Sequence, residues 1–241
     1  MKGVPYASAV ESLQYARVCT CPDLAFITEI LGRYQSNPGI EHWRIVKKAL
    51  CYVQDTKGLM LTYRRFDSLY IEGYSDSDFT RDVDDKKSTS GYVFTLAGGA
   101  ISWKSSKQTI TASPTMYAKF VACYEATGQV NWLKKFMPGL KVVDDIHKPL
   151  KLYCDNEPAV CYVHNNKSSS VVKHIDITFY VMKYKVRDHS ISLKHISTKK
   201  MLADPLTKGL PPNVFREHLT DMGLWENLRF LDNKGLVKNL F

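Results

Sequence analysis

The chain has 241 residues, 44% of them hydrophobic and 24% charged, which fits one or two globular domains with a sizeable core. Its 33 Lys and Arg residues exceed its 24 Asp and Glu residues, and the net charge of +9 favours a polyanionic partner, although a merely soluble basic protein would show the same excess. The sequence has no N-terminal apolar leader, no apolar run of about 18 residues and no Cys-x-x-Cys pair, so we expect neither secretion, nor a membrane span, nor a zinc ribbon.

The first part of the chain is predicted to be helical. Apolar residues recur at helical spacing from Tyr6 to Tyr34, with a break at Pro22, and again from Glu41 to Val53. The segment 59–63 then has the composition of a strand. Residues 1–66 are therefore expected to form a small, mainly helical unit.

From residue 67 the pattern changes to short strands separated by turns and helices. The expected order is three strands, a helix, a strand, two helices, a strand and a short helix, at residues 69–76, 91–96, 100–104, 113–136, 150–155, 157–164, 174–187, 191–196 and 203–208. Pro211-Pro212 is expected to end the compact unit. Three antiparallel strands, followed by strands reached through helical crossovers, predict an α/β fold with a mixed five-stranded sheet and flanking helices.

Three aspartates stand out in this second unit. Asp76 and Asp155 each end a predicted strand, and Asp204 interrupts an otherwise apolar segment. A single residue of this kind is more often an exposed turn carboxylate. Three carboxylates on rigid backbone, however, are the oxygen donors that hard divalent cations prefer. Together they predict a divalent-metal site.

Six segments of the second unit resemble the ribonuclease H domain of copia-type LTR retrotransposon polyproteins. They are residues 74–78 (YSDSD), 85–94 (DKKSTSGYVF), 101–105 (ISWKS), 153–156 (YCDN), 173–177 (KHIDI) and 203–208 (ADPLTK). Residues 6–10, 22–26 and 42–52 are similar to the thumb-like end of the adjoining reverse transcriptase. The resemblance implies a ribonuclease H-like fold and divides the chain into a reverse transcriptase remnant at 1–66, a ribonuclease H-like domain at 67–210 and a C-terminal helical tail at 211–241.

The resemblance also implies a reaction. In the family, four carboxylates hold two Mg²⁺ ions, which hydrolyse the RNA strand of an RNA–DNA hybrid. Asp76 would bridge the two ions, and Asp155 and Asp204 would complete their spheres. The residues that would contact the hybrid are Lys104, Lys107, Asn156, Lys173, His174 and Lys208, although a capping or packing role competes at His174.

The same resemblance implies the surroundings of the domain. The other partners would be the palm and fingers of the reverse transcriptase in the parent polyprotein, with no membrane. The expected location is cytoplasmic, with a virus-like particle or the nucleus as alternatives for the parent element. The polymerase palm would precede Met1, and Val83-Asp84-Asp85, which looks like the paired aspartates of a polymerase, is expected to be a decoy.

The chain departs from the family at the fourth carboxylate. The family pattern Ser-Thr-Glu-Ala-Glu has its catalytic Glu where residues 115–120, TMYAKF, place Lys119. A protonated lysine cannot donate to Mg²⁺, and Glu125 lies six residues on, at about 240° around the helix. Even a Lys119 that turned out to solvent would leave one metal ligand missing. The expected function is therefore an impaired nuclease.

Two other functions stay open beside the impaired nuclease. The chain could be an active ribonuclease H, or a non-catalytic nucleic-acid-binding or scaffolding module. A transposase or integrase of the same fold fits poorly, because it needs a Glu about 35 residues after the second Asp, where the chain has Ser190 and Ile191.

Overall fold

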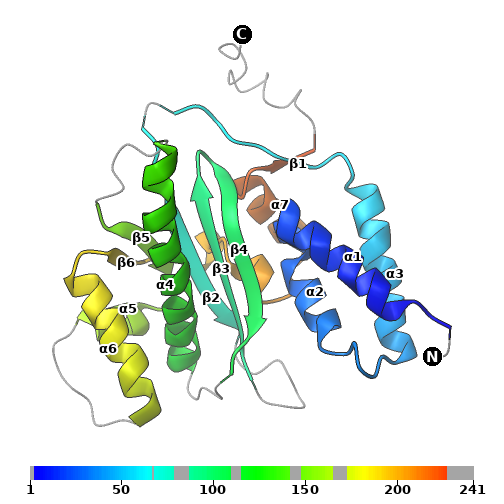
Figure 1. Cartoon of the computed structure of the whole chain (residues 1–241), viewed down its shortest axis with the longest axis horizontal. Helices are drawn as coiled ribbons and strands as arrows, with labels where there is room; N and C mark the ends of the chain where they lie inside the picture. Colours follow the sequence, from blue (N-terminus) through cyan, green and yellow to red (C-terminus); the bar gives the residue numbers. More distant parts are fainter. Residues whose placement is uncertain are drawn as a thin grey trace.

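The computed structural model describes residues 3–66, 68–78, 87–109, 115–141, 148–164 and 173–226, without the side chains of 115 and 173–177. At its centre is a mixed five-stranded sheet in the order β4-β3-β2-β5-β6 (Figure 1). The strands are β2 (Glu72–Asp78), β3 (Thr89–Leu96), β4 (Gly99–Lys107), β5 (Leu150–Cys154) and β6 (Ile191–His195). β2, β3 and β4 are antiparallel neighbours, and β5 and β6 run parallel to β2. The predicted α/β fold class is confirmed.

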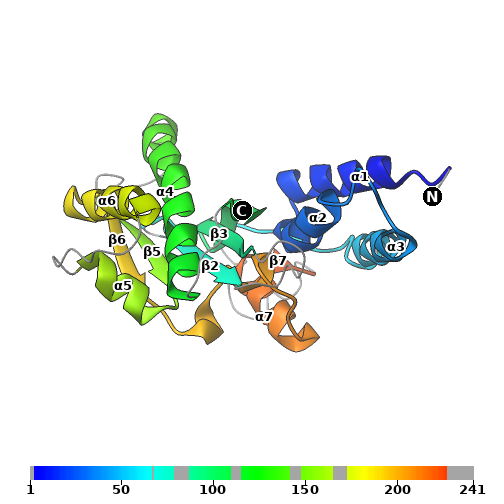
Figure 2. The same cartoon turned by 90° about the horizontal axis from the view of Figure 1, so that it is seen from below.

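Three helices cover one face of the sheet: α4 (Thr115–Leu140), α5 (Glu157–His164) and α6 (Lys173–Arg187) (Figures 1 and 2). The core beneath them is apolar and includes Phe94, Phe120, Leu152 and Met182, all 2% exposed or less. Burial on this scale is the main source of stability for such a layer. It also fixes the first turns of α4 next to β2. Ser113-Pro114, the predicted start of that helix, lies outside the described residues, as do Val83-Asp84-Asp85.

The opposite face of the sheet is covered by segments from the end of the chain. Met201, Leu206, Leu219 and Met222 pack on Val93 in a second buried cluster, with contributions from α7 (Pro212–Asp221). The prediction that the compact unit ends at Pro211-Pro212 is therefore wrong, because the apolar side of α7 closes this face. The short helix predicted at 203–208 is a single 3-10 turn, η3 (Asp204–Leu206), since Gly209 and Pro211 follow and neither favours a longer helix.

The N-terminal region has a core of its own. Helices α1 (Tyr6–Cys19), α2 (Ala25–Gly32) and α3 (Ile40–Asp55) enclose buried residues such as Val10 and Leu13, with the 3-10 turn η1 (Pro22–Leu24) between α1 and α2. Figure 2 shows this group on the side of the sheet away from α4–α6. The indole nitrogen of Trp103 on β4 donates to the carbonyl oxygen of Arg17 on α1 at 2.8 Å. The helices are thus anchored on the outer strand of the sheet.

A small second sheet joins the segment after α3 to the last described residues of the chain. β1 (Met60–Leu61) pairs antiparallel with β7 (Leu224–Trp225). The amide of Thr62 also donates to the carbonyl oxygen of Gly223, and the amide of Ala100 to that of Met222, both at 2.8 Å. The strand predicted at 59–63 is therefore shorter than expected, and its partner comes from the region predicted to be a helical tail. Residues 227–241 lie outside the described residues.

Gly223 has to be glycine at this junction, and its replacement gives a test of the fold. Its φ is +88°, and a Cβ there would lie 2.7 Å from the Cα of Gly99. We expect Gly223→Ala to lower the free energy of unfolding by roughly 2–4 kcal/mol in urea denaturation. The control is Gly128→Ala in α4, where a Cβ meets nothing within 4 Å and should stabilise the protein by about 0.5–1 kcal/mol. Equal effects at both sites would contradict the proposed close approach.

Candidate carboxylate site

The three predicted aspartates lie at the edge where β2 and β5 end. Asp76 belongs to β2, Asp155 directly follows β5, and Asp204 begins the turn η3. The Asp76 side chain is 0% exposed, and those of Asp155 and Asp204 are almost as deeply buried. Because β2 and β5 are parallel neighbours, their C-terminal ends meet at the same edge of the sheet. Lys119, on the first turns of α4, reaches this edge.

Lys119 points into the cluster and bridges two of the aspartates. Its Nζ lies 2.6 Å from Oδ1 of Asp76 and 2.5 Å from Oδ1 of Asp155, and its side chain is only 12% exposed. The alternative that Lys119 turns out to solvent is therefore wrong. The buried charge of Asp76 explains why Lys119 points inward, since an unpaired carboxylate in this position would be very costly.

A second ammonium group and two hydroxyls complete the contacts. Lys208 Nζ lies 2.9 Å from Oδ2 of Asp204 and 3.7 Å from Oδ2 of Asp76. Thr207 Oγ1 donates to Oδ2 of Asp76 at 2.7 Å. On the other aspartate, Thr198 Oγ1 donates to Oδ2 of Asp155 at 3.2 Å. Three carboxylates thus share two internal cations.

Burial and these cations set the protonation states. Burial opposes ionisation of Asp76, but the ammonium groups of Lys119 and Lys208 outweigh it and hold the pKa of Asp76 below its ordinary value. Burial also opposes the charged form of Lys119, yet the carboxylates of Asp76 and Asp155 raise the pKa of Lys119 above its ordinary value. For Asp204, burial and the charge of Asp76 raise the pKa to about 7, against the effect of Lys208. Asp76 and Lys119 are therefore an ion pair at neutral pH.

These contacts do not fit a pair of divalent metal ions. Both oxygens of Asp76 and both oxygens of Asp155 already accept hydrogen bonds from Lys119 or from a threonine. Oδ1 of Asp204 is buried without a hydrogen-bond partner among the described residues, and it is the one oxygen of the cluster suited to a further cation. Within the described ranges, no group of three or more His, Cys, Asp and Glu side chains is arranged to hold a metal ion.

Glu125 does not approach the cluster, as the helical geometry predicts. It lies on the side of α4 that faces β3 and β4, where its carboxylate contacts the hydroxyls of Ser90 and Ser106. Burial there raises the pKa of Glu125, although the two serine hydroxyls and the charge of Lys104 act to lower it.

The predicted hybrid-binding residues lie in different surroundings. Lys104 is exposed on β4, and the backbone amide of Lys107 donates to Glu29 Oε1 at 3.2 Å. Asn156 Oδ1 accepts from the amide of Ala159 at 2.9 Å, so this side chain caps α5. Lys208 is part of the carboxylate cluster rather than of an open surface. The side chains of Lys173 and His174 lie outside the described residues.

Sequence reasoning missed the two threonines of the cluster. Thr207 follows Asp204 by three residues, so a single turn at 204–207 already brings its hydroxyl to the same edge. That signal was present in the segment ADPLTK. Thr198 had no comparable signal, because its position depends on the turn η2 (Thr198–Lys200) that follows β6.

No family model matches the chain, but several known proteins are similar to it. The Pol polyprotein of transposon TNT 1-94 from Nicotiana tabacum, described as retrovirus-related, is 40% identical over 215 residues, 89% of this chain and 16% of the polyprotein. The corresponding polyprotein of transposon RE2 from Arabidopsis thaliana is 30% identical over 91% of this chain and 15% of its own length. The secreted RxLR effector protein 161 of Plasmopara viticola is 41% identical over 133 residues, 55% of this chain and 94% of the effector.

Solved structures resemble the chain more distantly. The LC11 ribonuclease H1 in complex with an RNA/DNA hybrid is 18% identical, with a TM-score of 0.41 over 57% of this chain and 93% of that one. A foamy viral protease-reverse transcriptase in complex with double-stranded DNA is 14% identical, with a TM-score of 0.46 over 80% of this chain and 32% of that one. None of the helices in the described ranges combines the length and apolar character needed to cross a bilayer. The chain spans about a sixth of the plant polyproteins that it matches, and it belongs to the retrovirus-related Pol polyproteins of transposons.

Proposed function

We propose that this domain derives from a magnesium-dependent ribonuclease H that cuts the RNA strand of RNA–DNA hybrids during reverse transcription, and that its nuclease activity is impaired in this copy. The observation that carries the proposal is the position of Lys119, whose ammonium group bridges Asp76 and Asp155 at 2.6 and 2.5 Å. In the family, a glutamate at this position and the three aspartates would hold the metal ions. Here the carboxylates are neutralised from within the chain.

The electrostatic argument is direct. Mg²⁺ prefers oxygen ligands and an octahedral shell, and Lys119 supplies neither. A unit positive charge about 4 Å from another costs roughly 4 kcal/mol at an effective dielectric constant near 20, and Mg²⁺ has two charges. Displacing Lys119 would also break two hydrogen bonds to ionised groups. Metal binding at the family's positions should therefore be weak.

Binding of nucleic acid does not need the metal site. The net charge of +9 favours attraction to a phosphate backbone, and exposed Lys104 is available for such contacts. A non-catalytic binding or scaffolding module is thus the second candidate function. In either case we infer that residues 1–66 are the end of a reverse transcriptase, that 67–210 are the ribonuclease H-like domain, and that the palm and fingers of the parent polyprotein are partners. We also infer a cytoplasmic location, with a virus-like particle or the nucleus as alternatives for the parent element.

A cleavage assay on the full chain tests the proposal. The substrate is an end-labelled RNA annealed to DNA, with Mg²⁺ present or chelated. We expect no magnesium-dependent cleavage by the unmodified chain and clear cleavage by Lys119→Glu, which restores the fourth carboxylate. The matched control is Lys119→Glu combined with Asp76→Asn, which should be inactive because the central ligand is weakened. Cleavage by the unmodified chain would show that another group supplies the fourth ligand.

A further inference from the structure

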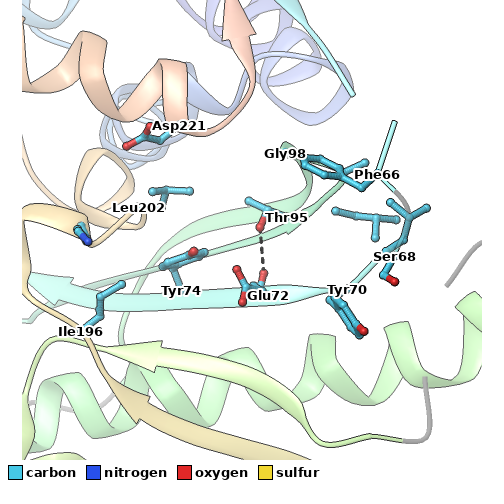
Figure 3. A pocket seen from close by; sticks show the side chains of 14 residues that line it. Phe66, Ser68, Tyr70, Glu72, Tyr74, Thr95, Gly98, Ile196, Leu202 and Asp221 are labelled. Carbon is cyan, nitrogen blue, oxygen red and sulfur yellow. Dashed lines mark hydrogen bonds between the residues drawn. The ribbon is translucent and has the colours of Figure 1, made fainter. Parts of the chain in front are cut away.

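A pocket of about 540 Å³ lies beside the carboxylate site on the sheet face that α7 covers. Figure 3 shows Glu72 and Tyr74 on one side of β2, with Leu202 and Asp221 facing them across the hollow and Phe66 at its far end. The volume falls within the range of roughly 300–1,000 Å³ that small-ligand pockets have. None of the residues that form the carboxylate site lines this pocket.

Aromatic rings form part of the pocket wall. Phe66 lies in the connection between β1 and β2. It is 51% exposed, so part of its ring is open to a ligand in the pocket. The ring of Tyr74 is stacked on that of Tyr153, with the centroids 5.1 Å apart, and is therefore held in place. A flat aromatic ligand could contact Phe66 and Tyr74 without displacing any packed side chain.

The charged groups of the pocket have distinct positions. Glu72 lies inside, and its Oε1 accepts from Lys151 Nζ at 3.1 Å, while Asp221 is exposed on the opposite wall. Lys200 also lines the pocket and is exposed. Exposed Arg65 precedes Phe66 in the chain. Two carboxylates and one exposed cation, Lys200, therefore line the hollow, and a second exposed cation is next to Phe66 in the chain.

We propose that this pocket binds one unpaired nucleotide of a single-stranded nucleic acid. The base would stack on Phe66, Tyr74 would close the opposite end of the hollow, the carboxylates of Glu72 and Asp221 would accept from the exocyclic amine of the base, and Lys200 and Arg65 would contact the adjoining phosphates. A base within a duplex cannot turn its face to side chains, so only an unpaired base fits. A basic chain with half-exposed aromatic residues is the combination that single-strand binding requires.

The pocket lies close to the carboxylate site along β2. Tyr74 and Asp76 are two residues apart on β2 and lie on the same side of the strand, about 7 Å from each other along it. Leu202 and Asp204 are also two residues apart, in the turn that leads into η3. One nucleotide spans a similar distance. A strand held in the pocket would therefore pass the carboxylates, but the inference stands whether or not the carboxylate site cuts RNA.

The test uses the full chain and the fluorescence anisotropy of a labelled single-stranded oligo(dC). Base stacking is worth about 1–3 kcal/mol per base, so Phe66→Ala should weaken binding between about 5-fold and 150-fold. Phe66→Leu should weaken it similarly because the ring is lost, and Phe66→Tyr should retain it. The control is Tyr180→Ala on α6, which removes a 63% exposed aromatic side chain away from the pocket and should change the affinity less than 2-fold. Oligo(dT), which has no exocyclic amine, should bind more weakly than oligo(dC).

Three results would overturn the inference. Phe66→Ala and Tyr180→Ala could weaken oligo(dC) binding equally, or Phe66→Leu could bind as the unmodified chain does. A labelled oligo-arginine peptide could lose affinity with Phe66→Ala while oligo(dC) binding stays unchanged, which would assign the pocket to a basic protein segment instead. Hybrid cleavage by Lys119→Glu is a separate readout, so loss of the nuclease proposal would leave the single-strand result intact.

Discussion

Replacing Lys119 by methionine is expected to lower the free energy of unfolding by about 3–5 kcal/mol at neutral pH. Methionine fills a similar space but leaves Asp76, whose side chain is 0% exposed, with one fewer cation. Removing one partner of a buried ion pair costs this much because the remaining charge stays buried. Urea denaturation followed by circular dichroism measures the change.

A second ion pair of the same protein provides the control. Lys151 Nζ lies 3.1 Å from Glu72 Oε1, but the two side chains are 44% and 32% exposed. Lys151→Met should therefore cost less than about 1 kcal/mol. If the two methionine variants are destabilised equally, Lys119 is not the buried cation of the cluster.

The free energy of unfolding should also depend on pH through the two charges of the Asp76–Lys119 ion pair. The pKa of Asp76 is lowered in the folded protein, so its contribution is present above its unfolded value near 3.8 and is lost as the pH falls. The pKa of Lys119 is raised, so its contribution is full below its unfolded value near 10.5 and is lost as the pH rises through the folded value. Lys119→Met should flatten the alkaline loss, because no ammonium group remains there to titrate.

The second large effect concerns Lys119→Glu, whose stability should depend on Mg²⁺. Without the ion, a fourth carboxylate would face Asp76 and Asp155, and like charges in a buried site repel. With the ion bound to the folded state alone, stability should rise by about 2.7 kcal/mol at a Mg²⁺ concentration 100 times the dissociation constant. Thermal unfolding with and without Mg²⁺ measures this without any nuclease assay.

The unmodified chain should show no comparable magnesium effect. In that chain the ammonium group of Lys119 already occupies the position between Asp76 and Asp155 where a metal ion would bind. Lys119→Gln is a further control, because it removes the ammonium group without adding a ligand charge and should gain far less from Mg²⁺ than the glutamate variant. A clear rise in the melting temperature of the unmodified chain would mean that a divalent ion binds despite Lys119.

The sheet and its aspartates could be predicted from sequence because their signals are local. Predicted strands ending on Asp76 and Asp155 place both carboxylates on one edge once the strands are parallel neighbours, although β2 itself continues to Asp78. The direction of the Lys119 side chain could not be predicted in this way. It depends on the burial of Asp76, which no spacing along the chain reveals.

Other features depend on contacts between distant segments. β7 has two residues, too few for any alternating pattern, and it forms because Met60 and Leu61 offer a free edge. The pocket combines Phe66 with Lys200 and Asp221, which are far apart in sequence. Pro211-Pro212 looked like a boundary, since prolines often end elements, but the buried side of α7 follows it.

The pairing of β1 with β7 has a practical consequence for anyone who expresses part of this protein. A fragment of residues 67–210 would follow the proposed domain boundaries, yet it would lack Leu219, Met222 and Leu224, which cover one face of the sheet. The exposed apolar face would favour aggregation. An inactive preparation of that fragment would therefore report a truncated core, and only the intact chain can show what Lys119 does.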